Sequence, residues 1–373
     1  MKLLYIAPLP IDFENLDGVP KKILCQANAM QCEFDVEILY YFDGKVRLYS
    51  VKNKSEKLLG KATSKLSVLK TATKLVKTRK YVGSYIRYPR SDYFFISMLK
   101  SFKKAEMRIV VEIPTYPYDK EGFETFKGRI INYLDISFRG FLHKYVDRIV
   151  TYSDDKEIFK IPTINTINGI DFSKVEFDKS AININNSVDL IAVSAMFRVH
   201  GYERLIEGLN DYYCSGGARN IKLKLVGKGD ECAKYENLVK KYKLAEHVIF
   251  YGAQFGDALQ KLYIGNAVGV NSLAIHRQGL IKESTLKTKE YAAKGLPVIS
   301  SSYVDAFSAE GNEEYVYRVA PDESNISINE LLTFIDKIYS KPTELVRESI
   351  RNDGSKVCDI AITMKPVIQF LKS

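Results

Sequence analysis

The chain has 373 residues, 46% of them hydrophobic and 27% charged, which is the balance of a globular protein long enough for two domains. It has no apolar run near the roughly 18 to 20 residues that span a bilayer, and a proline and an acid come too early for a signal peptide, so we expect a cytoplasmic chain that starts at Met1. Five scattered cysteines without a C-x-x-C pair indicate reduced thiols, and the formal charge of +10 favours phosphate-bearing partners.

The first half of the chain alternates short β-branched runs with segments of helical period, a pattern typical of a parallel sheet covered by helices. Strands are predicted at residues 2–7, 34–41, 84–88, 108–113 and 148–152, and helices at 21–30, 91–104 and 126–145. The fold class is therefore α/β.

Much of the positive charge lies between Lys52 and Lys80, a stretch with ten Lys or Arg residues and one acid, Glu56. Apolar residues recur there at helical spacing from Leu58 to Val76, which predicts a cationic amphipathic helix. Such a helix either packs its apolar stripe on the domain core, the interpretation we favour, or binds an anionic membrane surface.

The second half repeats the pattern, with strands predicted at 188–193, 222–226, 248–251, 268–271 and 297–300 and helices at 202–213, 231–242, 257–264 and 285–294. A polar stretch with the turn Asn168-Gly169 separates the halves. We predict one Rossmann-like domain at residues 1–168 and a second at 169–354, with a helix at about 355–373 packing back on the first. Ligands of doubly wound sheets bind at the carboxyl ends of strands, so we expect the two domains to face across a cleft.

The stretch from Glu283 to Pro297, ESTLKTKEYAAKGLP, predicts a helix that begins at Ser284 or Thr285. A helix N-terminus offers free N–H groups and a positive dipole to a diphosphate, and Lys287 and Lys289 add charge in the first turns. The Glu290 carboxylate could accept two hydrogen bonds from a ribose. Each residue alone also fits an ordinary exposed helix.

The whole stretch resembles the donor site of the GT-B glycosyltransferases, in particular the retaining family 4. In that family a glutamate contacts the sugar, and a second, eight positions later and followed by A-x-G-L-P, holds the ribose. Glu290-Tyr-Ala-Ala-Lys-Gly-Leu-Pro matches the second half, whereas Lys282 stands at the first position and the acid, Glu283, comes one residue late. The resemblance implies a GT-B fold with two Rossmann-like domains, an acceptor domain at residues 1–168 and a nucleotide-sugar domain at 169–354. It also implies ribose binding by Glu290 and sugar contact by Glu283.

Four further motifs resemble the same family. Gly227-Lys228-Gly229 resembles its G-x-G turn, or is an ordinary tight turn, and the run ending at Gly252 resembles the strand beside the base. Gly18 stands where the family lets the backbone approach the diphosphate, or opens a helix. Asn168-Gly169-Ile170-Asp171 resembles the inter-domain N-G-[VI]-D.

The run His200-Gly201-Tyr-Glu-Arg204 resembles the H-G-x-[DE]-R variant of bacterial surface-polysaccharide enzymes, with Ala195 where many members have an arginine. His200 would donate to a phosphate oxygen. For Arg204 we favour a structural pair with a carboxylate.

Loops at the ends of other strands supply the remaining candidates. Arg277, in His276-Arg-Gln-Gly, would meet the leaving diphosphate. Glu112, Thr115 or Tyr116 would replace the histidine that related enzymes use at the sugar, while Arg87 and Arg90 would bind an acidic acceptor or pair with Asp92. The expected reacting-centre residues are Glu112, Arg277, Glu283 and Lys287, and the expected nucleotide-sugar ligands are Gly18, His200, Gly201, Gly227, Lys228, Gly252, His276, Ser284, Thr285, Leu286 and Glu290.

The resemblance implies a hexosyltransferase that moves sugar from a nucleotide diphosphate sugar, expected to be a UDP-sugar. The acceptor would be a saccharide or lipid-linked saccharide in capsule, O-antigen or other surface-glycan synthesis. Anomeric configuration would be retained. Without D-x-D, H-E-x-x-H or clustered His and Cys, we expect no metal and no cofactor. The enzyme would sit peripherally on the inner face of the cell membrane through Lys52 to Lys80.

Three other functions compete with this interpretation. An oxidoreductase is disfavoured because the first strand leads into Pro8-Leu-Pro10 rather than G-x-G-x-x-G. A nucleic-acid-binding protein would rest on charge alone, and the chain lacks a motif with aromatics among basic residues, so we expect no nucleic-acid partner. A non-catalytic paralogue that binds the nucleotide sugar fits the departures at Ala195 and Lys282.

Overall fold

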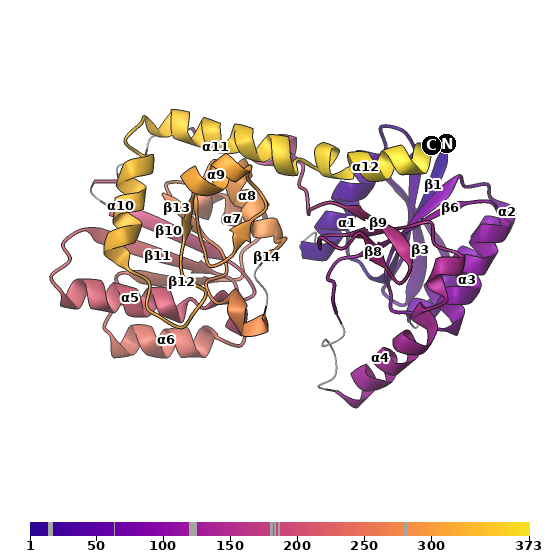
Figure 1. Ribbon diagram of the computed structural model, residues 1–373, viewed down its shortest axis with the longest axis horizontal. Helices are drawn as coiled ribbons and strands as arrows, with labels where there is room; N and C mark the ends of the chain where they lie inside the picture. Colours follow the sequence, from indigo (N-terminus) through magenta and orange to yellow (C-terminus); the bar gives the residue numbers. More distant parts are fainter. Residues whose placement is uncertain are drawn as a thin grey trace. The chain divides into compact units, whose positions relative to one another are not determined.

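The computed structural model describes residues 1–13, 18–62, 64–118, 125–179, 182, 184–185, 187–279 and 282–373, except the side chains of Lys282 and Glu283. Within these residues the chain forms two compact units (Figure 1). Unit 1 comprises residues 1–169 and 360–373, and unit 2 comprises residues 170–359.

Unit 1 is built on one sheet whose described strands run in the order β4-β3-β2-β1-β5-β6-β7-β9-β8. The strands from β2 to β9 in this order pair in parallel, and β3, β4 and β8 add antiparallel edges. The strands are β1 (Lys2–Pro10), β2 (Asp35–Phe42), β3 (Lys45–Ser50), β4 (Ser55–Lys61), β5 (Gly83–Arg87), β6 (Arg108–Ile113), β7 (Arg148–Thr151), β8 (Glu157–Ile158) and β9 (Ile161–Asn165).

Helices cover both faces of this sheet. Alternate residues of each strand point to opposite sides, and on both sides they are apolar and need cover. Leu4 and Ile6 of β1 pack with α2 and α3, whereas Leu3 and Tyr5 pack with α1 and α12. The helices are α1 (Gly18–Met30), α2 (Lys65–Thr78), α3 (Tyr93–Lys104), α4 (Phe126–Arg139), the 3-10 turn η1 (Leu142–Lys144) and α12 (Ile360–Lys372). The last helix of the chain thus completes the core of the first unit.

The predicted helix between Lys52 and Lys80 is only partly correct. Residues Ser55–Lys61 form the edge strand β4, on which Leu58 is exposed, and charged side chains such as Lys57 and Lys61 suit a sheet edge. The helix α2 begins after Ser64 and buries Val68, Leu69, Ala72 and Leu75 on the core. The core-packing interpretation therefore holds for α2.

Unit 2 has an all-parallel sheet in the order β12-β11-β10-β13-β15-β17, counted over the described strands. Helices α5, α6 and α10 pack into one core cluster, and α8 packs with α11 on the other side. A Cβ on Gly269 of β13 would lie 2.5 Å from the Tyr291 ring, so the glycine lets α8 approach the sheet.

The elements of unit 2 begin with η2 (Phe172–Lys174), β10 (Ser187–Val193), η3 (Arg198–His200), α5 (Glu203–Cys214), β11 (Asn220–Val226), α6 (Cys232–Lys241), β12 (Val248–Gly252), α7 (Gly256–Tyr263) and β13 (Val268–Val270). They continue with η4 (Ile275–Gln278), β14 (Lys282–Glu283), α8 (Leu286–Ala293), β15 (Val298–Ser300), β16 (Tyr303–Val304), α9 (Ala309–Glu314), β17 (Val316–Arg318), α10 (Ile328–Ile338) and α11 (Thr343–Cys358). None of the described helices has the length and hydrophobicity that crossing a bilayer requires.

Candidate functional site

The N-terminus of α8 lies at the carboxyl edge of the unit 2 sheet. Thr285 precedes the helix in an extended conformation, and no hydrogen bond to its side chain caps the helix in the described structure. Because the first N–H groups of a helix have no intrahelical acceptor, this turn presents donors and a positive dipole end to an anion. The predicted helix boundary is correct to within one residue at each end.

Lys287, in the first turn of α8, reaches the loop that follows β13. Its Nζ donates to Ser272 Oγ at 3.3 Å. Burial lowers the pKa of His200 and the positive charge of Lys287 lowers it further, to about 3, so the ring is neutral at pH 7. The charge of Lys287, on α8, is therefore close enough to the η3 loop to influence the His200 ring.

The tautomer of His200 follows from its hydrogen bond. Its Nδ1 accepts from the Phe197 N–H at 2.8 Å, which places the single proton of the neutral ring on Nε2. Nε2–H is then a donor, the role that the sequence predicts for this histidine toward a phosphate oxygen.

Backbone bonds join the loop of His200 to the loop after β13. Leu273 N donates to His200 O at 2.8 Å and Ala274 N to Val199 O at 3.1 Å. Gly201 has φ of 60°, and a Cβ there would lie 2.5 Å from the Ala274 Cβ. Only glycine fits this left-handed, crowded position, so Gly201 acts by letting the two loops meet.

The G-x-G turn packs equally closely on the loop that follows β10. A Cβ on Gly227 would lie 1.8 Å from Ser194 O, and one on Gly229 would lie 1.9 Å from Ala195 O. Gly227 N donates to Gly252 O at 2.7 Å, which ties the ends of β11 and β12 together. Gly227 and Gly229 thus let the turn after β11 pack on the loop after β10, and the bond to Gly252 joins the turn to the end of β12.

Lys228 is exposed at the tip of this turn, close to Gly252. Glu290 is half-buried in the second turn of α8 and lies beside Tyr263, whose pKa is raised by burial and by the Glu290 charge. Leu286 is the first residue of α8, and Ser284 Oγ accepts from Lys289 Nζ at 3.2 Å. The backbone of Glu283 is in β14, but its side chain lies outside the described residues.

Arg277 is not placed for the predicted role at a leaving diphosphate. Its side chain is 9% exposed, and its guanidinium donates to Arg198 O at 2.7 Å and pairs with two carboxylates, Glu203 at 2.7 Å and Glu323. His276 also turns to Glu323, with its Nε2 2.8 Å from the carboxylate. Carboxylates distant in sequence thus pair with the basic side chains of this loop, and in this structure Arg277 stabilises η4.

Lys289 is also occupied, contrary to the expectation that it adds charge for a diphosphate. It is fully buried and forms an ion pair with Asp305, which is itself buried. The pair fixes the inner side of α8, so Lys287 is the cation of this helix that lies on the side of the His200 loop.

Arg204 has the predicted structural role. It is buried and donates to the carbonyls of Leu273, Ala320 and Ser324 and to Asp322. Sequence reasoning did not find Ser272, which holds Lys287, or Glu203, which holds Arg277. For Glu203 the available signal was an acid next to the buried Arg204 in the H-G-x-[DE]-R motif.

Unit 1 contributes two predicted residues, Gly18 and Glu112. Gly18 opens α1 with φ of 40°, where a Cβ would meet nothing within 4 Å. Glu112 is fully buried: its Oε1 is 2.8 Å from Lys22 Nζ, and its Oε2 is 3.5 Å from Arg87 Nη1. Glu112 therefore holds α1 to the sheet in this structure rather than meeting a substrate, and Arg87 pairs with it.

Acid unfolding tests this assignment of Glu112. Burial alone would raise its pKa, but Lys22, Arg87 and a hydrogen bond from Tyr152 lower it from 4.5 to about 2. A carboxyl with a lowered pKa stabilises the fold fully above its unfolded pKa and loses this contribution as the pH falls toward the folded pKa. We expect about 3 kcal/mol of unfolding free energy to be lost between pH 5 and 2 in wild type, and a shallower loss in Glu112→Gln.

Denaturant unfolding at a series of pH values measures this difference. The control is Glu106→Gln, an exposed acid of the same unit, which should follow wild type. Identical pH dependence in wild type and Glu112→Gln would contradict the buried ion-pair assignment.

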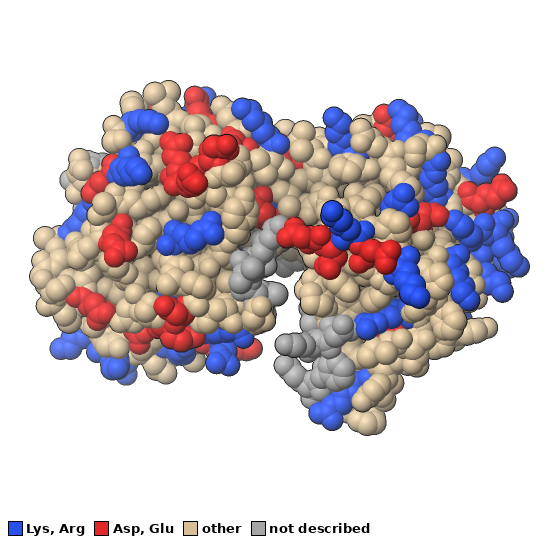
Figure 2. All heavy atoms as spheres, viewed as in Figure 1, with Lys and Arg blue, Asp and Glu red and all other residues tan. Residues whose placement is uncertain are grey.

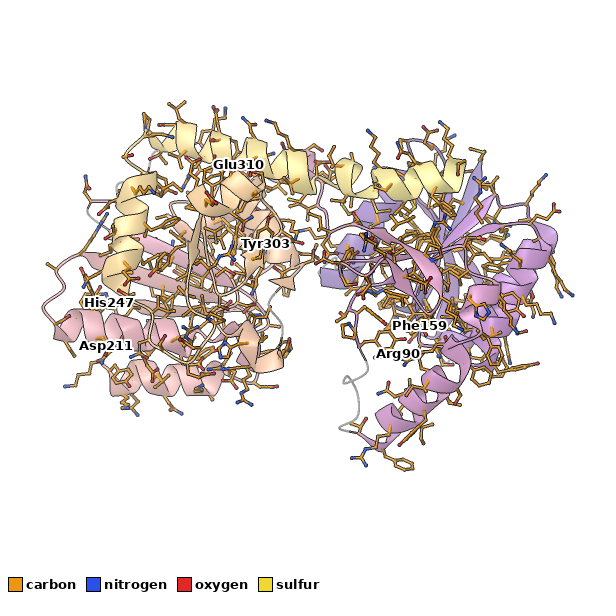
Figure 3. All side chains as sticks on the ribbon, viewed as in Figure 1. Arg90, Phe159, Asp211, His247, Tyr303 and Glu310 are labelled. Atoms are coloured by element: carbon orange, nitrogen blue, oxygen red, sulfur yellow. The ribbon has the colours of Figure 1, made fainter. Side chains whose placement is uncertain are left out.

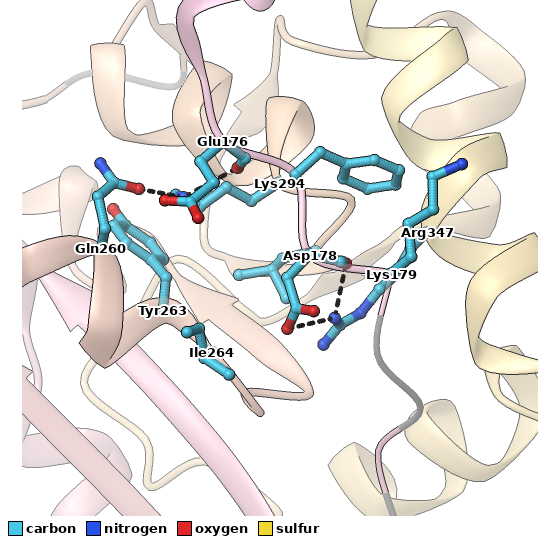
Figure 4. Close-up of a pocket in the computed structure, with 10 residues that line it drawn as sticks. Glu176, Asp178, Lys179, Gln260, Tyr263, Ile264, Lys294 and Arg347 are labelled. Carbon is cyan, nitrogen blue, oxygen red and sulfur yellow. Dashed lines mark hydrogen bonds and ion pairs between the residues drawn. The ribbon is translucent and has the colours of Figure 1, made fainter. Parts of the chain in front are cut away.

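A pocket of about 280 Å³ lies at the other edge of the unit 2 sheet, where α7 and α8 end (Figure 4). Lys294 donates to Gln260 at 2.5 Å and to Glu176 O at 3.2 Å, and Arg347 donates to Asp178. Because the protein itself pairs these cations, we assign no ligand to this pocket. Across the described residues, no three His, Cys, Asp or Glu side chains form a group that could hold a metal ion.

Comparison with known proteins places this site in a known fold. Residues 187–336, which contain the α8 site, match the family model described as glycosyl transferases group 1. The fold is GT-B. The family match indicates a glycosyltransferase domain at residues 187–336, and the solved structures confirm the predicted α/β fold with two Rossmann-like domains.

Three solved GT-B structures illustrate the likeness. HepE of Anabaena in complex with UDP is 14% identical, covers 100% of both chains and has a TM-score of 0.64. A glycosyltransferase from Rickettsia africae is 12% identical over 100% of this chain and 97% of that one, with a TM-score of 0.66. The lipopolysaccharide outer core galactosyltransferase WaaB is 12% identical over 100% of both, with a TM-score of 0.58. No curated protein matches significantly.

Proposed function

We propose that this protein transfers a hexose from a UDP-sugar to a saccharide acceptor. The observation that carries the proposal is the combination, at the carboxyl edge of unit 2, of the uncapped α8 N-terminus with Lys287 in its first turn and a neutral His200 whose pKa the Lys287 charge lowers. HepE has been solved with UDP and with UDP-glucose, which supports a uridine nucleotide.

The leaving diphosphate would be stabilised by groups already in place. As the anomeric bond lengthens, negative charge grows on the phosphate oxygens, and preorganised N–H donors and a lysine lower the energy of that state without a metal. Neutral His200 would donate one hydrogen bond, and Lys287 would supply the positive charge. The Glu290 carboxylate would accept from the ribose hydroxyls, and Glu283 would contact the sugar.

The stereochemistry and acceptor belong to the same proposal. By its resemblance to family 4 the enzyme would retain the anomeric configuration, with the donor phosphate helping to deprotonate the acceptor hydroxyl. WaaB is named for the lipopolysaccharide outer core, which supports a growing surface glycan as the acceptor class. A saccharide acceptor, free or lipid-linked, follows.

A second candidate is a nucleotide-sugar-binding paralogue without catalysis. It is favoured by the engagement of Arg277 with Glu203 and Glu323, and of Lys289 with Asp305, since two cations expected at the diphosphate serve the structure instead. Binding of a UDP-sugar without release of UDP, in the presence of varied saccharides, would identify it.

A thermal-shift screen against UDP, GDP, ADP and their common sugars tests the site. At a UDP concentration of about 100 Kd, the bound unit gains roughly 2.7 kcal/mol and its Tm rises by about 5–10 °C. In Glu290→Ala, loss of the ribose hydrogen bonds should weaken binding about 10- to 100-fold. Glu236→Ala, at an exposed acid of α6, is the matched control and should bind as wild type. No shift with any nucleotide would overturn the proposed function.

A further inference from the structure

Helix α4 of unit 1 exposes apolar residues and buries polar ones, the reverse of a helix that packs on a hydrophobic core. Its apolar residues Phe126, Ile130, Tyr133 and Leu134 are 80, 46, 66 and 43% exposed, whereas the residues that it buries are Asn132 and Asp135. The spacing of the four apolar residues (i, i+4, i+7, i+8) places them on one side of the helix, opposite Asp135.

The polar side of α4 fixes the helix to the body of unit 1. Asp135 accepts from Ser91 N at 2.5 Å, from Tyr118 OH at 2.8 Å and from Tyr88 OH. Arg139 lies over the ring of Phe159 at 4.9 Å. Figure 3 labels Phe159 and Arg90 where α4 meets the unit. The hydrogen bonds of Asp135 thus hold the polar side of α4 against unit 1 and leave the apolar side exposed.

Two further aromatic residues are exposed at the start of α3. Tyr93 and Phe94 are 64 and 42% exposed and follow Ser91, the residue that Asp135 contacts. Phe126, Ile130, Tyr133 and Leu134 form what we call the α4 face. An exposed patch of large aromatic and aliphatic side chains marks a surface that another body covers.

The charge around the α4 face is positive. Between residues 125 and 145 the one acid is the buried Asp135, while Lys127, Arg129 and Lys144 are exposed. Lys70 of the adjoining α2 lies 5.5 Å from the Phe94 ring centroid. On the face shown in Figure 2, α4 carries uncharged and basic atoms, and Lys and Arg gather over α2.

We propose that the α4 face docks on an anionic membrane surface, with the aromatic and aliphatic side chains in the interface and the basic residues at the lipid head groups. Aromatic and apolar side chains bordered by Lys and Arg are the composition of an interfacial helix. A second copy of this chain is disfavoured as the occupant because face-to-face packing would oppose like charges. The contact is centred on α4, where the exposed Lys127 and Arg129 of the same helix lie beside its apolar residues.

Vesicle flotation without nucleotide tests the proposal independently of sugar transfer. Full-length protein is mixed with phosphatidylcholine vesicles containing 30 mol% phosphatidylglycerol, or with phosphatidylcholine alone. We expect flotation with the anionic vesicles at low salt and at least tenfold weaker binding to the neutral ones. The variant Ile130→Gln/Tyr133→Ser/Leu134→Gln should lose at least tenfold in vesicle affinity with an unchanged Tm, since these side chains are exposed.

Matched controls separate the α4 face from general hydrophobicity and charge. Leu345→Gln/Ile362→Gln, at exposed apolar positions of α11 and α12, should bind vesicles as wild type. Lys127→Gln/Arg129→Gln should weaken binding about fivefold per cation removed, and Lys240→Gln/Lys241→Gln on α6 should weaken it less. The proposal would be overturned if the triple variant floated with the anionic vesicles as well as wild type does. It would also be overturned if wild type bound no vesicles but dimerised in sedimentation velocity, and the triple variant did not dimerise.

Discussion

Replacing Lys289 by methionine is expected to lower the free energy of unfolding by about 3–5 kcal/mol, because it leaves the buried Asp305 carboxylate without its counter-charge. For a unit of this size the Tm should fall by about 10 °C. Denaturant and thermal unfolding at pH 7 measure the loss.

The matched control is Lys287→Met, two positions earlier on the same helix. Since Lys287 is only partly buried and its Nζ bonds to Ser272 across the loop, we expect the stability to change by less than about 1 kcal/mol while UDP affinity falls. The double variant Lys289→Met/Asp305→Leu should recover most of the stability, because an apolar pair can replace a buried ion pair. Equal destabilisation by Lys287→Met and Lys289→Met would contradict the division of roles.

Gly229→Ala is expected to abolish nucleotide binding and to destabilise the protein by about 1–3 kcal/mol. The added Cβ would lie 1.9 Å from Ala195 O and 2.7 Å from Met196 O, both backbone atoms, so either the G-x-G turn or the loop after β10 must move. His200 is carried on that second loop, so the donor that we assign to the phosphate would move too. Calorimetric titration with UDP and denaturant unfolding measure the two effects.

Gly140→Ala provides the matched control for this substitution. Gly140 has φ of −61° and ψ of −18°, which alanine adopts easily, and an added Cβ meets nothing within 4 Å. We expect it to retain nucleotide binding and to gain up to about 1 kcal/mol by lowering the entropy of the unfolded chain. Normal UDP binding by Gly229→Ala would show that the close approach of the two loops is not needed.

The sequence predicted the parallel strands and most helices because their signals are local. Runs such as the one at Arg108–Ile113 have a β-branched composition that no helix competes with, and the structure has the same bounds. The segment around Leu58 was misassigned because its apolar spacing also fits a helix, and only its pairing with β3 makes it a strand. That pairing is a tertiary interaction that local propensity does not contain.

At the candidate site, the sequence located the backbone features but not the partners of the charges. Asp305 lies 16 residues after Lys289, and Glu323 lies 46 residues after Arg277, so neither pairing follows from local spacing. The direction in which α4 faces was equally hidden. Its apolar periodicity predicts a helix, but the anchor at Asp135 depends on Ser91, Tyr88 and Tyr118, which come from other segments.

The most direct test of the central claim is UDP release from UDP-sugars, measured with a panel of saccharide acceptors for wild type and Glu290→Ala. The proposed function predicts acceptor-dependent release of UDP by wild type and a fall of about 10- to 100-fold in kcat/KM for Glu290→Ala, with Glu236→Ala unchanged. UDP-sugar binding without release for any acceptor, or equal turnover by Glu290→Ala and wild type, would contradict it.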